Sequence, residues 1–144
     1  MSNKAPELIA IEHDNHHATH IGQTEDGRQF FLTTPFEPMK NDFIALYLFD
    51  QNGRLLDAQI DDLGQRDQVN DTSAKQLFEQ RLKSLGEIEY CRIEVQPFVI
   101  ERFGTTFGLV PLPPEDEDEI WWVTAEPGDY MAFCEPWDSG EYDT

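Results

Sequence analysis

Basic residues are scarce in this chain of 144 residues, where 10 Lys and Arg stand against 29 Asp and Glu and leave a net charge of −19. The imbalance is strongest from residue 115 to residue 144, which hold eleven acids and no Lys or Arg. Nucleic-acid binders gain affinity when Lys and Arg contact phosphates, so the charge argues against nucleic acid and equally against an anionic membrane surface. It favours a basic protein partner, unless it serves only to keep the protein in solution.

Cysteine and long apolar runs are also scarce. The two cysteines, Cys91 and Cys134, each lie among alternating apolar residues, so we expect buried thiols rather than a disulfide. The longest apolar run, Phe43–Phe49, is far shorter than the roughly 20 residues that a membrane span needs. The polar start M-S-N-K-A-P-E-L is no signal peptide, and we therefore expect a cytoplasmic protein.

Catalytic motifs are missing as well. The chain has no G-x-S-x-G and no phosphate-binding glycine loop. Asp57, Asp61 and Asp62 are close in sequence and Glu101 lies in an expected strand, but an acid–base pair needs a particular separation in space, which sequence does not give. We therefore expect a protein that is not an enzyme and has no cofactor.

The residues that are present predict a globular chain. Hydrophobic residues make up 39% and aromatic residues 12%. A length of 144 residues fits one domain, which buries roughly 70% of the surface of its unfolded chain. We expect a single domain over residues 1–144, with about residues 1–12 loosely ordered.

Turn signals between apolar stretches predict four consecutive hairpins. Their turns lie at Asp26-Gly27, at Asn52-Gly53, at Arg102–Gly104 and at Pro127-Gly128. Phe43–Phe49 is apolar at every position, which is typical of a central strand covered on both faces. Alternate aromatic residues of the last hairpin are expected in the core.

One helix is predicted from Thr72 to Leu85, with Asp71 or Thr72 as its N-cap and Gly86 just past its end. One face of this helix carries Ala74, Leu77, Phe78, Arg81, Leu82 and Leu85. The fold class is therefore α+β: an antiparallel sheet of about seven or eight strands, built from consecutive hairpins, with one helix (about residues 72–85) packed on it.

Local patterns add detail to this sheet. The segment R-L-L-D-A-Q-I alternates and predicts that Leu56, Ala58 and Ile60 point inward. Residues 61–71 are polar and are expected to form a loop. Residues 91–95, C-R-I-E-V, alternate and are expected to form one strand.

All four histidines lie in E-H-D-N-H-H-A-T-H, residues 12–20. On a helix, His13, His16 and His20 would share one face and suit zinc or nickel. The following residues look like the start of a strand, which would break that geometry. Adventitious metal binding and plain solvated or capping histidines therefore stay open as alternatives, and His20 is the one with the best claim to a structural or ligand role.

The last residues combine aromatic and acidic side chains beyond the last hairpin. Trp137 and Tyr142 are flanked by Asp138, Glu141 and Asp143. Exposed Trp and Tyr are common anchors of protein interfaces, and acids around them would attract a basic partner. These five residues are the candidate partner-binding site. The alternative is that the tail folds back and closes the sheet.

Four pieces of the chain resemble a largely uncharacterised family of small bacterial proteins: T-H-I-G-Q-T-E-D-G-R-Q-F, L-F-D-Q-N-G, F-G-T-T-F-G-L-V and P-W-D-S-G-E-Y-D-T. Some members are labelled formate hydrogenlyase regulatory protein. The resemblance runs from about His20 to the last residue and implies a regulator. With one helix and a repulsive charge, a regulator that binds protein fits this chain better than one that binds DNA.

The leading hypothesis is a non-enzymatic acidic binding or regulatory protein that acts on a basic protein partner. One version shields or inhibits that partner, as an immunity protein does. The alternative is a metal- or small-ligand-binding protein that uses His13–His20, and the sequence leaves a monomer and a homodimer equally open.

Overall fold

The computed structural model describes residues 6–13, 19–37, 40–114, 121–127, 131–133, 137 and 140–142. They form one α-helix, α1 (Asp71–Lys83), and one 3-10 helix, η1 (Arg66–Gln68). The first strands are β1 (Ile9–Ile11), β2 (Ile21–Thr24), β3 (Gln29–Thr33), β4 (Asn41–Phe49), β5 (Leu55–Gln65) and β6 (Ile88–Tyr90). The others are β7 (Ile93–Val95), β8 (Phe98–Arg102), β9 (Thr105–Leu112), β10 (Trp122–Glu126), β11 (Met131–Phe133) and β12 (Gly140–Tyr142).

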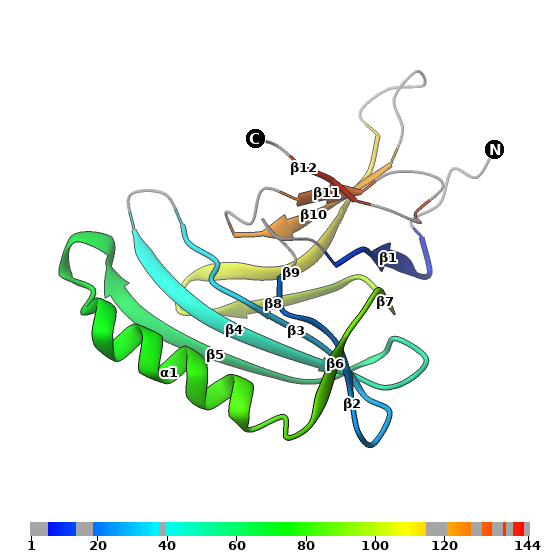
Figure 1. Cartoon of the computed structure of the whole chain (residues 1–144). Helices are drawn as coiled ribbons and strands as arrows, with labels where there is room; N and C mark the ends of the chain where they lie inside the picture. The colour runs from blue at the N-terminus through cyan, green and yellow to red at the C-terminus, as the bar shows by residue number, and fades with distance from the viewer. Residues whose placement is uncertain are drawn as a thin grey trace.

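The strands form two five-stranded antiparallel sheets and a two-stranded ribbon. The first sheet has the order β5-β4-β3-β2-β6, the second sheet has the order β12-β11-β10-β9-β8, and β1 pairs with β7. Figure 1 shows α1 lying along the first sheet, on the side away from the second sheet. The expected α+β class, with antiparallel hairpins and one packed helix, is confirmed.

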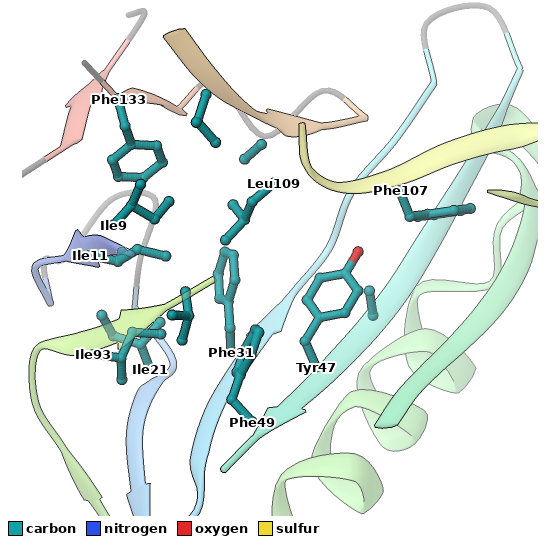
Figure 2. Close-up of a cluster of buried hydrophobic side chains, with 14 of the residues drawn as sticks. Ile9, Ile11, Ile21, Phe31, Tyr47, Phe49, Ile93, Phe107, Leu109 and Phe133 are labelled. Carbon is teal, nitrogen blue, oxygen red and sulfur yellow. The ribbon is translucent and has the colours of Figure 1, made fainter. Parts of the chain in front are cut away.

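The main core lies between the two sheets. In Figure 2, Leu109 and Phe133 of the second sheet point towards Phe31 of the first sheet and Ile9 of β1. The ribbon contributes further fully buried side chains, such as Ile93. A second, smaller core lies under α1 and consists of buried Phe30, Leu32, Ile44, Leu46, Leu48 and Leu85, with helix residues packed against it.

The expectation that Phe43–Phe49 forms a covered central strand is confirmed. It belongs to β4, which lies between β3 and β5, and its residues alternate between the two cores. Phe43, Ala45, Tyr47 and Phe49 face the second sheet, while Ile44, Leu46 and Leu48 face the helix. An apolar residue at every position follows from this double burial.

The four predicted hairpins are present as β2–β3, β4–β5, β8–β9 and β10–β11. Gly27 and Gly53 both have φ of 88°, as the predicted turns require. The single sheet of seven or eight strands is wrong in its count, because the described residues form twelve strands. The additional ones include β1, β6, β7 and β12, which have three residues each and are too short to show an alternating pattern.

The predicted inward position of Leu56 is wrong. Phe49 of β4 pairs with Leu55, and Leu48 pairs with Asp57, so Leu56 is an extra residue that forms a β-bulge. The bulge shifts the alternation by one position. Leu56 is therefore 54% exposed and Leu55 packs against the main core instead.

The loop expected over residues 61–71 begins later than predicted. Strand β5 continues to Gln65, and Asp61 and Asp62 pair with Ile44 and Phe43 of β4. These acids can occupy a strand because they lie at the edge of the sheet, where polar side chains find partners or solvent.

The predicted helix is confirmed, with boundaries of Asp71 and Lys83 instead of 72 and 85. The N-cap is Asn70, not Asp71 or Thr72, and its side-chain oxygen accepts a hydrogen bond from the Ser73 N–H at 3.0 Å. The residues packed on the sheet include the predicted Leu77, Phe78, Leu82 and Leu85.

Two short strands replace the single strand expected over residues 91–95. Strand β6 ends at Tyr90 and pairs with β2, whereas β7 pairs with β1. The chain changes partner at Cys91, which is only half-buried. Ile9–Ile11 lie within the segment that is expected to be loosely ordered, and they form the buried strand β1.

Candidate interaction surface

The second sheet has one face in the core and one face away from it. Its inner face consists of Phe98, Ile100, Phe107, Leu109, Val123, Ala125 and Phe133. Because side chains alternate along a strand, the residues between them form the other face. This outer face consists of Val99, Glu101, Thr106, Gly108, Val110, Leu112, Trp122, Thr124, Glu126 and Ala132.

Within the described part of the chain, the only α-helix, α1, covers the other sheet (Figure 1). The outer face exposes apolar side chains: Val99 is 53% exposed and Leu112 is 44% exposed. Leu112 pairs with Trp122 across β9 and β10, and Val110 is partly exposed in the next outward row. The outer face thus presents an apolar band to its surroundings.

Carboxylates accompany this band. The Thr106 hydroxyl donates to Glu101 Oε1 at 2.8 Å, and the Thr124 hydroxyl donates to Glu126 Oε1 at 3.1 Å. None of the outer-face positions carries Lys or Arg. The basic residue of β8, Arg102, lies on the inner side and donates to the Ala58 carbonyl of β5 at 3.2 Å. The outer face is therefore both apolar and acidic.

The predicted partner-binding residues are placed only in part. Trp137 is partly buried against the main core, and its carbonyl accepts a hydrogen bond from the Ala10 N–H at 2.8 Å. These contacts agree with the alternative that the tail folds back, and the role of Trp137 in partner binding stays a prediction. Strand β12 pairs with β11, so the tail folds back and extends the second sheet.

Glu141 stands opposite Ala132 in that pairing, which is an outer-face row. Tyr142 stands opposite Met131. Asp138 and Asp143 lie outside the described residues. The structure thus places the backbone of two of the five predicted residues, Glu141 and Tyr142, in the strand at the edge of the second sheet.

Trp122 is the aromatic residue that the sequence prediction misses. The prediction places alternate aromatic residues of the last hairpin in the core without saying which. Alternation along β10 decides which residues face the core. Val123 and Ala125 are both small and apolar, whereas the set Trp122, Thr124 and Glu126 includes polar residues. Val123 and Ala125 are buried, so Trp122 faces outward.

Two of the four histidines come together. The rings of His13 and His20 lie 5.4 Å and 5.8 Å from the ring of Tyr90, and His20 also contacts Phe78 at 4.9 Å. Thr19 joins them: its carbonyl accepts from His13 Nε2 at 3.0 Å, and its hydroxyl bonds His20 Nδ1 at 2.8 Å. Burial, followed by the proximity of His13, lowers the pKa of His20 below 6.5.

The third predicted ligand, His16, lies outside the described residues. No group of three or more His, Cys, Asp or Glu that could hold a metal ion occurs in the described ranges. His20 packs on two aromatic rings, which agrees with a structural role, one of the two roles that the sequence suggests for this residue.

The carboxylates considered as an acid–base pair make structural contacts. Asp61 accepts two hydrogen bonds from Arg81 of α1, at 2.8 Å and 2.9 Å. Asp62 accepts from the Asn41 side chain, and Asp57 accepts from the Ala58 N–H, each at 2.9 Å. The bonds of Asp61 and Asp62 fasten β5 to α1 and β4, and the bond of Asp57 lies within β5 itself.

The thiols follow the sequence expectation only in part. Burial, and then the nearby Glu89, raises the pKa of Cys91 above 9.0, although this side chain is not fully buried. A raised pKa keeps the thiol protonated at neutral pH and lowers its reactivity. Cys134 lies outside the described residues.

A shallow hollow of about 300 Å³ is lined by Gln23, Gly27, Gln29, Gln51, Arg92 and Glu94. The buried amide of Gln29 donates to Asp50 O and Glu94 O and accepts from Glu94 N. It thereby joins β7 to the β4–β5 turn. Arg92 pairs with Glu94 and Glu12. The polar groups of this hollow therefore act mainly as a joint between strands.

In the described segments, no helix has the length and apolarity to cross a membrane. Comparisons with protein-family models, with curated proteins and with solved structures found no match. The fold and its surface define the protein as a helix-backed β-sandwich with an acidic, apolar outer sheet face.

Proposed function

We propose that this protein is a non-enzymatic, acidic binding or regulatory protein that contacts a basic protein partner through the outer face of its second sheet. The observation that carries the proposal is the composition of that face. Val99, Leu112 and Trp122 provide apolar surface, while Glu101 and Glu126 provide charge of one sign.

The two kinds of residue have separate roles in such a contact. Apolar and aromatic side chains in the centre of an interface provide affinity when water leaves them. Carboxylates around them attract a basic partner and raise the rate of association, an effect that the net charge of −19 strengthens over longer distances. An acidic partner would be repelled by these carboxylates and by the net charge.

The consequence for the partner is that its basic surface is covered. The protein would act in the cytoplasm as a shield or inhibitor, in the manner of an immunity protein, or as a regulator of its partner. The regulatory version agrees with what the family resemblance implies.

A pair of charge variants tests the proposal. Glu101→Lys with Glu126→Lys changes the outer face, and Glu79→Lys with Glu87→Lys makes the same change in charge at two exposed positions on or next to α1. Proteins retained from a lysate of the native host by each form are quantified by mass spectrometry at low and moderate salt. A basic protein should be retained by the wild type and the control and lost by the outer-face variant.

Two results would overturn the proposal. The first is retention of the same proteins by both variants, which would place the contact elsewhere. The second is that no basic protein binds the wild type in a salt-dependent way.

A metal-binding function is the second candidate, because the fold brings His13 and His20 onto the same side chain, Tyr90. These two imidazoles would be ligands for zinc or nickel. Native mass spectrometry of untagged protein, purified without chelator, should then show one ion per chain that is lost on His20→Ala. A bare polypeptide mass, or metal retained by that variant, would exclude a specific site.

A further inference from the structure

One side of the sandwich leaves its core incompletely covered. Both sheets end there, the first at β5 and the second at β8, and the Arg102 side chain of β8 donates to the Ala58 carbonyl of β5. Leu55, Ala58, Phe98 and Ile100 pack on the main core from these two strands and are only partly buried. We call this the β5–β8 side.

The reason for the incomplete cover is the position of β8. Phe98 of β8 packs on β4, with its ring 4.8 Å from that of Tyr47 and 5.6 Å from that of Phe49. The second sheet ends at β8. Among the described strands, none of the second sheet continues beyond β8 to cover Leu55 and Ala58 of β5.

The free edge of β5 is protected against pairing. The Ala58 N–H donates to Asp57 Oδ1, the Ala58 carbonyl accepts from Arg102, and the Gly64 N–H donates to Asp62 Oδ1. The register with β4 also shifts at two places along the strand. Bulges and charged side chains are the usual means by which an edge strand avoids a second strand.

The free edge of β8 differs from that of β5. Its pairing with β9 runs without a register shift from Phe98 to Arg102. The turn that follows has positive φ at Phe103 and Gly104, as in a two-residue hairpin turn. The pair that closes such a hairpin, here Arg102 and Thr105, is hydrogen-bonded.

Alternation then fixes which backbone groups point away from β9. Ile100 and Phe98 bond to β9 together with Arg102, so Val99 and Glu101 direct their N–H and C=O groups to the free edge. Val99 is also 53% exposed. No strand in the described ranges pairs with this edge.

We propose that β8 accepts an extended segment of the basic partner, which adds to the second sheet next to Val99 and Glu101. This inference rests on the proposed function and names the way in which the partner binds. Backbone hydrogen bonds would provide affinity and alternate side chains would provide specificity. The added strand would lie over β5 and cover Leu55 and Ala58.

The surroundings of this position define the chemistry of the added strand. Side chains on its inner face would contact Leu55 and Ala58 and should be apolar. On its outer face, the residue beside Glu101 should be Lys or Arg, because opposite charges on neighbouring strands attract. The partner segment therefore alternates apolar and basic residues.

The charge also decides between a partner and a second copy of this chain. Pairing of two β8 strands would join chains that each carry a net charge of −19, with a Glu101 carboxylate from each copy on the outer face of the junction. Like charges on adjacent strands are destabilising. A basic strand at the same edge is instead attracted by Glu101 and by the net charge.

Hydrogen exchange of the wild-type protein tests the proposal directly. The probe is a capped peptide of alternating Val and Lys, about seven residues long, which is the length of an ordinary strand. On its addition, exchange of the Val99 and Glu101 amides, followed by NMR, should slow by about tenfold or more. The Ile100 amide, already paired with β9, is the internal control and should change little.

A proline variant provides an independent test. Val99→Pro removes an N–H that points to the free edge, so the ladder with β9 stays intact and the protein should fold. Affinity for the peptide should fall by about tenfold or more, since an edge hydrogen bond is lost and the ring obstructs pairing. Val99→Thr keeps the N–H and should bind within a few-fold of the wild type.

Each remaining outcome overturns the inference in a distinguishable way. One outcome is that the peptide binds, and binds more weakly to the Glu101→Lys, Glu126→Lys variant, while exchange of the Val99 and Glu101 amides does not slow. Strand addition at β8 would then be wrong, and binding to the outer face would remain supported. If a peptide of alternating Val and Glu binds equally, the basic preference fails. A dimer that Val99→Pro abolishes would assign the edge to a second copy. No binding of the Val–Lys peptide sinks the inference, while the lysate experiment still judges the proposed function.

Discussion

His20 shows how one residue links packing to pH. Its ring lies against Phe78 and Tyr90, where burial lowers its pKa below 6.5. The unfolded chain then binds a proton more readily than the folded one, so protonation favours unfolding. The contribution of His20 to stability is complete above pH 6.5 and is lost as the pH falls below that value towards the lowered pKa.

We therefore predict the behaviour of His20→Phe, which keeps an aromatic ring at this place and removes the titration. The difference in the free energy of unfolding between wild type and variant should be constant above pH 6.5 and should move in favour of the variant below it. Urea unfolding at a series of pH values measures this difference. The titration of the carboxylates, which both proteins share, cancels when the two free energies of unfolding are subtracted. A difference that does not vary from pH 7.5 to pH 5, about the range in which His titrates, would contradict the prediction.

The pair of Arg81 and Asp61 joins α1 to the edge of the first sheet. Its two hydrogen bonds are 2.8 Å and 2.9 Å long, and both side chains are largely shielded, at 30% and 21% exposed. We predict that Arg81→Met destabilises the protein by about 1–2 kcal/mol, because it leaves Asp61 without its charged partner. In the Asp61→Asn background the same change should cost clearly less. Equal costs in urea unfolding would show that the pair is not coupled.

At the scale of the element, the start of α1 offers a test of the observed cap. Asn70 accepts from the Ser73 N–H, which would otherwise have no partner within the helix. We predict that Asn70→Ala lowers the free energy of unfolding by about 1 kcal/mol, whereas Thr72→Ala has little effect. Thermal or urea unfolding of the two variants decides between the observed cap and the one suggested by sequence.

The elements that sequence predicts well are those specified locally. The hairpin turns at Gly27 and Gly53 depend on a backbone conformation that glycine adopts easily, and α1 depends on apolar residues at helical spacing. Three-residue strands such as β1 and β7 depend on each other across more than eighty positions, as Ile9 and Val95 do. No local pattern encodes such a pairing.

The candidate surface follows the same division. Which residues of β10 face outward can be predicted from the alternation of Trp122 with Val123 and Ala125. Sequence does not predict that the helix of the described residues lies elsewhere, because this depends on which of the two sheets α1 packs against. Trp137 shows the opposite case: its acidic neighbours in sequence suggest exposure, while packing against the core decides its place.

At the scale of the whole molecule, the net charge makes folding and binding respond to salt in opposite directions. Salt should stabilise the folded protein and weaken its binding to a basic partner. The 29 acids repel one another in the folded chain, and only 10 bases offset them. Salt screens this repulsion over a distance of about 10 Å at 0.1 M. We predict that the melting temperature rises as NaCl increases from about 0.01 M to 0.3 M, since compaction of a highly charged chain becomes less costly.

Binding of a basic strand or protein should respond in the other direction, because salt screens attraction between unlike charges. The Val–Lys peptide should therefore bind most tightly where the protein alone is least stable. The Glu101→Lys, Glu126→Lys variant separates the two effects: it should bind more weakly with a smaller salt dependence, and it should melt at the same temperature as the wild type or higher at low salt. Parallel salt dependences of melting and binding would mean that apolar contact, and not charge, dominates the association.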